Sequence, residues 1–269
     1  MGKLAITFIT LLAAALIVTS VSCGGVQTTP TPTPSPPPSS MPTPPLTPPA
    51  TTPEIQTKLV LRADTSQLSP DLMDTVVAEI VKRIEQRIED YGVTGASVMR
   101  QDTNNILVYL PEVENIDKLI ELITARGNLD FREMVYDNYG SPVLDGDGNP
   151  EWKPAMAIDS SGKEVQLTGQ YLQNNSQVLL NQFTNEPEVS FEFNNEGAYL
   201  FAQITGRLLE KELGIFLDDK LLIAPIVKVI LDSGKGVITG VSLDEARNLA
   251  IMLNSGTLPL PVELVSIDT

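Results

Sequence analysis

Proline limits the part of this chain that can fold. Nearly half of residues 28–53 are proline, interleaved with threonine and serine. Proline fixes φ and has no backbone N–H, so a segment this rich in proline forms neither helix nor sheet. Its expected conformation is extended polyproline II, a spacer of about 3.1 Å per residue and on the order of 75 Å in all. Residues 23–56 are therefore interpreted as a linker, which leaves roughly 213 residues for folded domains.

The segment before the linker has the pattern of an export signal. Lys3 precedes the apolar run 4–18, and the small residues 20–22 follow it. A run of about 15 apolar residues is shorter than the roughly 20 that span a bilayer, which favours a signal peptide over residues 1–22. Cys23, the only cysteine, stands where bacterial lipoproteins carry their lipid. We expect Cys23 to anchor the protein to the outer face of the cytoplasmic membrane; secretion after ordinary cleavage, or an uncleaved anchor, is the alternative.

The composition argues against several classes of chemistry. A net charge of −16 disfavours nucleic acid or anionic lipid as a partner of the folded part. The chain has no histidine, the commonest general base and metal ligand, and its single cysteine cannot form an internal disulfide. The sequence also contains no recognisable nucleophile–base pair or phosphate-binding loop. We therefore expect no enzyme, and no catalytic residue, metal or cofactor.

The pattern of residues 57–135 predicts a ferredoxin-like subdomain. A long amphipathic helix begins after Ser69 and ends at Gly92, with apolar residues three and four positions apart. The order of elements is β-α-β-β-α-β, which is the ferredoxin-like plan. The expected strands are 58–63, 96–100, 106–110 and the closing strand 129–135, and the second helix is 115–126.

Residues 136–269 predict a second α/β subdomain, the head. After an irregular stretch with a short helical candidate near 169–177, a strand at 189–193 precedes a helix capped by Asn194 or Asn195. Ser242 and Glu245 form a capping box that opens a helix over 242–255. This helix and the final strand, 259–266, are candidates to pack on the first subdomain. Other strands are expected at 214–217, 221–231 and 236–239. The fold class is thus α+β, with two α/β subdomains and antiparallel sheets.

Two acidic segments resemble sites but are better explained as turns. Residues 145–151 begin like a calcium-binding loop, but Pro150 replaces the required glycine and Met156 replaces the bidentate glutamate. A hairpin tip is the simpler interpretation. Asp218 and Asp219 lie between two apolar strands and precede Lys220, which is typical of a turn rather than of paired catalytic carboxylates.

Four aromatic residues leave two interpretations open. Phe191, Phe193, Tyr199 and Phe201 fall on a predicted strand and on the helix after it. They would form the core of the second subdomain, or some of them would line a peptide-binding groove. Spacing alone does not separate the two, and no groove residue is predicted.

Several short segments together resemble the first extracytoplasmic domain of SecD, the accessory subunit of the bacterial Sec protein-export translocase. Each segment is short, and the resemblance rests on their order across about 210 residues. The segments are 61–65, 87–93, 100–101, 106–111, 129–132, 167–169, 193–197, 201–205, 217–218, 224–225, 238–240, 245–246 and 255–259.

The resemblance implies a function and also marks a difference. It implies that the domain contacts emerging or unfolded preproteins, with the Sec translocase (SecYEG, SecF) as a further partner. SecD proteins carry membrane spans on both sides of this domain, whereas here a signal, a linker and a chain end at Thr269 take their place. The expected protein is a membrane-tethered, SecD-like binding module without an ion-driven step of its own. The alternative is a truncated or divergent SecD copy that acts as a docking partner of an envelope complex.

Overall fold

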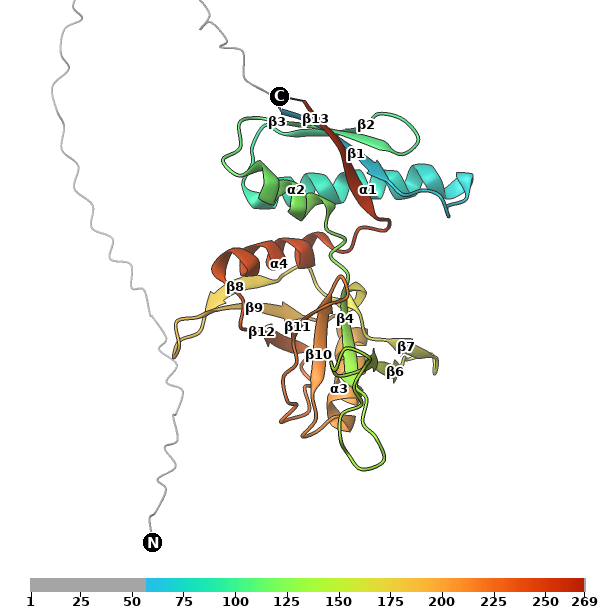
Figure 1. Cartoon of the computed structure of the whole chain (residues 1–269), viewed down its shortest axis with the longest axis vertical. Coiled ribbons are helices and arrows are strands. Elements are labelled where there is room, and N and C mark those ends of the chain that lie inside the picture. The colour runs from blue at the N-terminus through green and yellow to red at the C-terminus, as the bar shows by residue number, and fades with distance from the viewer. Residues whose placement is uncertain (1–56, 269) are drawn as a thin grey trace, which may run out of the picture. The chain divides into compact units, whose positions relative to one another are not determined.

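The computed structural model describes residues 57–268, which lie within one compact unit, Thr51–Thr269. The predicted signal peptide, Cys23 and the linker lie outside the described residues. The elements form two groups, and the last strand of the chain returns to the first group (Figure 1). We call β1, α1, β2, β3, α2 and β13 the base, and the elements from β4 to α4 the head.

The base is a four-stranded antiparallel sheet packed on two helices. Its strands are β1 (Thr57–Ala63), β2 (Ser97–Arg100), β3 (Asn105–Leu110) and β13 (Val262–Asp268), in the order β13-β1-β3-β2. One face of this sheet rests on α1 (Pro70–Tyr91) and α2 (Ile116–Thr124), as Figure 1 shows. The side chains of α1 that fill the core follow the predicted three- and four-residue steps: Val77, Ile80, Ile84 and Ile88 are all buried.

The ends of α1 are also as predicted. Ser69 occupies the N-cap position in extended conformation, and Pro70 begins the first turn. Gly92 ends the helix with φ of 97°, a left-handed conformation that glycine adopts at no steric cost. Both signals are local, so the sequence alone was sufficient to place this helix.

The strand that closes the base sheet is not the predicted one. The pattern assigned this place to 129–135, but β4 (Leu129–Met134) leaves the base and pairs with β10 in the head. The strand β13, from the far end of the chain, pairs with β1 instead, from Lys58 opposite Asp268 to Ala63 opposite Val262. Phe131 of β4 is fully buried in the head core, and this burial stabilises the pairing of β4 in the head. The domain bounds 57–135 and 136–269 remain a prediction.

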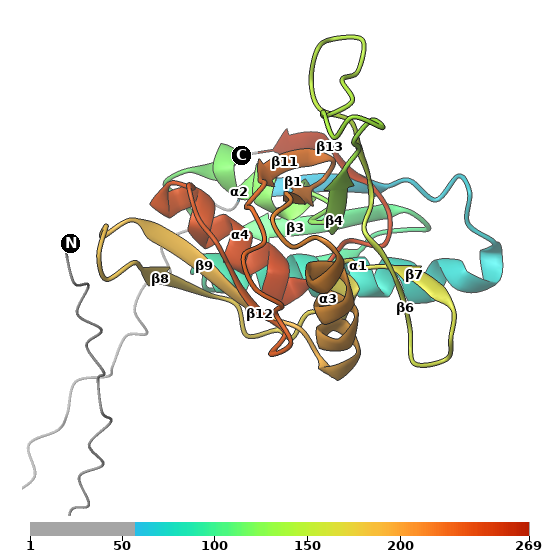
Figure 2. The same cartoon turned by 90° about the horizontal axis from the view of Figure 1, so that it is seen from below.

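The head contains three small antiparallel sheets. One has the order β11-β10-β4-β5, another β12-β9-β8, and the third is the hairpin β6–β7. The loop between β4 and β5 projects from the body in both views (Figures 1 and 2). The strands are β5 (Trp152–Pro154), β6 (Met156–Ile158), β7 (Glu164–Gln166), β8 (Gln177–Leu180), β9 (Pro187–Glu192), β10 (Leu213–Leu217), β11 (Lys220–Ile223) and β12 (Lys235–Ile238).

Two helices complete the head. In α3 (Asn195–Arg207), the Asn194 side chain accepts a hydrogen bond from the Gly197 N–H, and in α4 (Leu243–Ser255) the predicted capping box of Ser242 and Glu245 is present. The helix α4 lies between the base and the rest of the head, with α1 on one side and β8 and β9 on the other. It thus contributes to the head core while contacting the base.

Two further predictions need correction. The strand expected over 221–231 ends at Ile223, because Pro225 interrupts the regular pairing and has no N–H to donate. Only an isolated bridge, between Glu212 and Ile226, continues it. The short helix suggested near 169–177 is a single 3₁₀ turn, Gly169–Tyr171.

Candidate functional site

An apolar groove opens in the head between β12 and the loop that follows β11. Its volume is about 780 Å³, within the usual range for ligand-binding clefts. The lining comes from β8 and the residues just before it, β9, α3, β10, β12 and the loop. It consists of residues 175, 177, 190–192, 201, 205, 213, 215, 225–229, 231 and 235–237.

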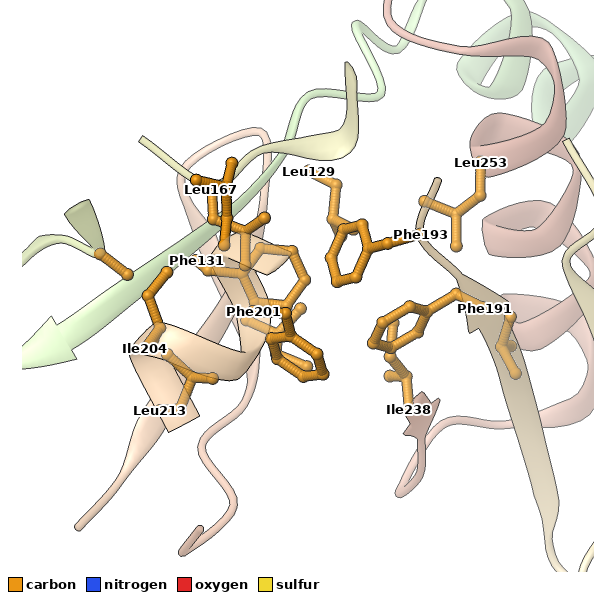
Figure 3. Packing of buried hydrophobic residues seen from close by; sticks show 14 of the residues in the cluster. Leu129, Phe131, Leu167, Phe191, Phe193, Phe201, Ile204, Leu213, Ile238 and Leu253 are labelled. Atoms are coloured by element: carbon orange, nitrogen blue, oxygen red, sulfur yellow. The ribbon is translucent and has the colours of Figure 1, made fainter. Parts of the chain in front are cut away.

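The floor of the groove belongs to the aromatic core of the head. Phe191 and Phe201 line the groove and also pack against Phe131 and Phe193 (Figure 3). The ring centroids of these four residues lie 5.2–6.4 Å apart in tilted or edge-on pairs, a favourable aromatic geometry. Phe191 and Phe201 are therefore core residues that also line the groove, whereas Tyr199 is exposed.

Gly236 of β12 is required where the strand passes the floor. A Cβ atom at this position would overlap the Phe191 ring. Without a side chain, the strand lies directly on the ring. Glycine in a strand interior often marks such a close approach. The edge of β12 is thereby held next to the apolar floor.

The opposite wall is the loop after β11, and it keeps apolar side chains exposed. Of the residues that line the groove, Ile226 and Val229 are 48% and 60% exposed. The loop is held at both ends. The Val227 N–H donates to the Lys211 carbonyl, at 2.9 Å, and the Leu231 N–H donates to the Thr205 hydroxyl, at 3.0 Å. The exposed apolar residues are thus fixed in place at the groove.

Charged residues at the rim are paired with one another. Lys228 lies 2.8 Å from Glu210, and Lys235 lies 3.6 Å from Glu192. Lys228, Glu210 and Lys235 are largely solvated and Glu192 is partly exposed, so these ion pairs add little stability. The groove itself therefore offers an apolar interior with a mixed, hydrated rim.

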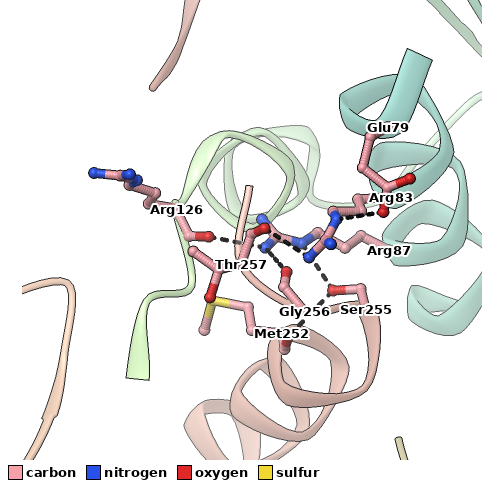
Figure 4. Close-up of polar contacts among 8 residues, drawn as sticks. All are labelled: Glu79, Arg83, Arg87, Arg126, Met252, Ser255, Gly256 and Thr257. Atoms are coloured by element: carbon pink, nitrogen blue, oxygen red, sulfur yellow. Dashed lines mark hydrogen bonds and ion pairs between the residues drawn. The ribbon is translucent and has the colours of Figure 1, made fainter. Parts of the chain in front are cut away.

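A second polar cluster lies at the junction between base and head (Figure 4). Arg87 of α1 is fully buried, and burial lowers its pKa to about 10, with the nearby carboxylate of Asp218 acting in the opposite direction. Its guanidinium donates to the C-terminal ends of α2 and α4, where carbonyl groups lack helical partners. The acceptors are the carbonyl oxygens of Leu122, Ala125, Arg126 and Gly256 and the hydroxyl of Ser255.

Neighbouring residues extend this cluster. The Arg83 guanidinium donates to the Thr257 carbonyl and pairs with Glu79, at 3.0 Å. The Asp218 carboxylate accepts hydrogen bonds from the Gly127 and Asn128 N–H groups, at 3.0 and 2.7 Å. Two segments connect the base with the head, one after α2 and one after α4. Both are held by hydrogen bonds from side chains of α1 or of the head.

The acidic segments form turns, as the sequence predicted. Asp218 and Asp219 have φ of 48° and 65° and join β10 to β11 as a two-residue turn. The Asp145 carboxylate accepts from the N–H groups of Asp147 and Asn149 at a hairpin tip. These backbone bonds hold the pKa of Asp145 below its usual value, the Asn149 bond contributing most. Across residues 57–268, no three His, Cys, Asp or Glu side chains gather as a metal site would require.

The groove residues were missed by sequence reasoning. The stretch 213–231 is the most apolar after the export signal, and its pattern predicts two strands, 214–217 and 221–231, rather than a strand and a loop. Pro225 inside this stretch and Gly234 and Gly236 after it were the available signals that part of it forms an exposed loop. Within the part of the chain that the structure describes, no helix has the length and hydropathy needed to cross a bilayer.

Two protein-family models match this sequence. Residues 153–260 match the family described as the P1 head subdomain of SecDF, and residues 77–136 match the N-terminal part of the P1 domain of the protein translocase subunit SecDF. The described part of the chain is a SecD P1-like domain.

Individual relatives of the P1-like domain are protein translocase subunits named SecD. The protein from Dehalococcoides mccartyi is 37% identical over 76% of this chain, and the one from Desulfurispirillum indicum is 31% identical over 78%. These alignments cover 46% and 44% of the relatives. The chain thus spans less than half the length of the SecD proteins that it matches.

Solved structures share the fold. One of them is described as "Structure and function of a membrane component SecDF that enhances protein export". It aligns with 79% of the present chain at a TM-score of 0.61 and 27% sequence identity, and the alignment covers 99% of the solved chain. A crystal structure of SecDF in a super-membrane-facing form gives the same TM-score and identity, with 30% of its chain covered.

Proposed function

We propose that the P1-like domain captures emerging or unfolded preproteins and thereby assists Sec-dependent protein export. One observation carries the proposal: the head holds an apolar groove of about 780 Å³ whose lip leaves Ile226 and Val229 about half exposed or more. An apolar groove with a hydrated rim suits weak, sequence-tolerant binding of apolar segments. No catalytic step is part of this function.

The setting of this activity is inferred from the relatives. The matched proteins are named as subunits of a protein translocase, and one matched structure is described as a membrane component that enhances protein export. We infer that the partners are unfolded preproteins and, beside them, the Sec translocase (SecYEG, SecF). The domain acts outside the cytoplasm, held at the outer face of the cytoplasmic membrane through a lipid on Cys23. Tethering raises its concentration where preproteins emerge.

A binding measurement with matched variants tests the capture. The full chain is expected to bind a reduced, alkylated protein and not its native form. Val229→Asp places a carboxylate in the groove lip and should weaken binding about tenfold or more. Val265→Asp on β13 of the base, 43% exposed in the parent, is the control and should bind normally. Equal affinity of all three chains, or no binding to the unfolded protein, contradicts the proposal.

The anchor has its own test. Cys23→Ala should shift the protein from the membrane fraction to the soluble fraction, or stop its processing, because the acyl chains on this residue hold it. Fractionation and intact mass are the measurements. A variant that stays with the membrane at unchanged mass and processing would show that Cys23 carries no lipid.

A further inference from the structure

The strand β12 places one edge of its sheet at the groove. β12 is the outer strand of the sheet β12-β9-β8, and residues 235–237 form one wall of the groove. A strand edge in the wall of an apolar groove offers hydrogen-bonding backbone next to a site for side chains. This combination suits an extended polypeptide more than a helix, whose backbone groups are already paired.

The hydrogen-bond pattern shows which backbone groups of β12 face the groove. The Phe193 N–H donates to the Gly234 carbonyl, at 2.9 Å, so this antiparallel pair is of the hydrogen-bonded kind. Such pairs alternate along the strands, which makes Gly236 opposite Phe191 hydrogen-bonded as well. It follows that the N–H and C=O groups of Lys235 and Val237 point away from β9, toward the open edge.

The neighbouring strand gives an independent check. The Glu192 carbonyl, opposite Lys235, accepts a hydrogen bond from the Gln173 N–H, at 2.8 Å, on the side of β9 away from β12. The backbone N–H and C=O groups of Glu192 therefore point away from Lys235. The alternation deduced from Gly234 and Phe193 holds along this part of the sheet.

We propose, on the basis of the proposed function, that the groove binds its client as an added β-strand on β12. The client is an extended segment with apolar residues at alternate positions, because side chains alternate between the two faces of a strand. Those on the Gly236 face meet Phe191 and the rest of the apolar floor. The chain's net charge of −16 favours clients with lysine or arginine flanking the apolar segment.

Backbone-methylated peptides test this binding mode. The parent peptide alternates valine and threonine between flanking lysines. One isomer carries N-methyl groups on the valine amides only, and the other on the threonine amides only. Because alternate N–H groups point to opposite edges of a strand, one isomer should bind the full chain like the parent and the other should lose affinity about tenfold or more. Equal affinities of the two isomers, whether both retained or both lost, overturn strand addition.

A variant of the protein tests the same edge. Val237→Pro removes an N–H that makes no bond to β9, and proline is tolerated at a sheet edge when its missing donor faces outward. The expected result is a large loss of affinity for the parent peptide with an unchanged thermal midpoint. Replacing the lysine flanks with glutamate should also weaken binding. A folded Val237→Pro variant with parental affinity contradicts the proposal; if this variant does not fold, the methylated peptides decide.

The failures of the two proposals are distinguishable. If Val229→Asp abolishes capture of the unfolded protein while both methylated isomers bind alike, then capture in the groove stands and strand addition is wrong. An amphipathic helical peptide that binds more tightly than the alternating peptide would also overturn strand addition. If no unfolded protein is captured at all, the proposed function itself is wrong.

Discussion

The base and the head expose apolar residues in different ways. In the base, the exposed apolar side chains include Leu72 on α1, Met99 on β2 and Val265 on β13, which are spread over a helix and the two edges of the sheet. In the head, Ile226, Val229 and Val237 surround a cavity whose floor is the core itself. This difference is the reason for placing the proposed binding surface in the head.

The two parts also differ in how their strands are completed. The base uses one four-stranded sheet on two helices, whereas the head divides its strands among three short sheets. Short sheets leave more edges per residue, and unpaired edges are available for binding another chain. The division into short sheets that makes the head less regular thus also provides the strand edges that the proposed capture of polypeptide requires.

The largest expected effect tests the assignment of β4 to the head. Phe131→Ala removes a buried ring from the centre of the aromatic cluster and should lower the free energy of unfolding by about 3–5 kcal/mol. Hydrogen exchange should accelerate mainly in β9 and β10. Ile84→Ala in the base core is the matched control and should act mainly on β1 and β3. Faster exchange in β1 and β3 for Phe131→Ala would place β4 in the base after all.

The next effect tests the junction between the two parts. Arg87→Met keeps an apolar stem but leaves the carbonyl ends of α2 and α4 without their shared donor. We expect a loss of about 2–4 kcal/mol in the free energy of unfolding, measured by urea titration. Lys82→Met, on the exposed side of the same helix, should change little. Equal stability of the two variants would mean that the buried guanidinium contributes nothing net.

A smaller effect tests the close approach of β12 to the floor. Gly236→Ala forces the Phe191 ring to move and should destabilise the head by about 1–3 kcal/mol while weakening capture of unfolded protein. Gly206→Ala, where a Cβ would lie 3.8 Å from Ile230, is the control and should be neutral or stabilising in its helix. If Gly236→Ala leaves both stability and binding unchanged, the strand does not need this contact.

The smallest effect concerns the ion pair between Lys118 of the base and Asp244 of the head, 2.8 Å apart. The hydrogen bond and charge of Lys118 lower the pKa of Asp244 below its unfolded value, so the pair contributes stability above about pH 3.9 and loses it as pH falls through the folded pKa. The parent and Lys118→Met should therefore differ slightly in stability at neutral pH and converge in acid. A difference that grows on acidification would contradict this sign.

Local signals in the sequence were sufficient for individual elements. The helix α1 begins and ends where Pro70 and Gly92 indicate, and Ser242 with Glu245 opens α4. The turn at Asp218 was also predicted from neighbouring residues alone. In each case the deciding interactions lie within a few residues along the chain. One local signal was overlooked: Arg87 follows Ile80 and Ile84 on the apolar face of α1, which is the pattern of a buried charge.

The sequence pattern did not determine which strand closes the base sheet. Both 129–135 and the final strand alternate apolar residues, so each satisfies the pattern of a strand with one buried face. The pairing of Lys58 with Asp268 joins residues about 210 positions apart, and no local signal reports it. The decision lies in packing, because Phe131 fills the head core only if β4 stays in the head.

The sequence by itself determined the α+β class, the helices with their caps and a chain without histidine and with a single cysteine. The groove was decided by tertiary structure alone. Its lining comes from segments between residues 175 and 237, and the same apolar residues would be core if another strand covered β12. Whether an apolar residue becomes core or binding surface depends on which sheet edge is left unpaired, and pairing between distant strands sets that edge.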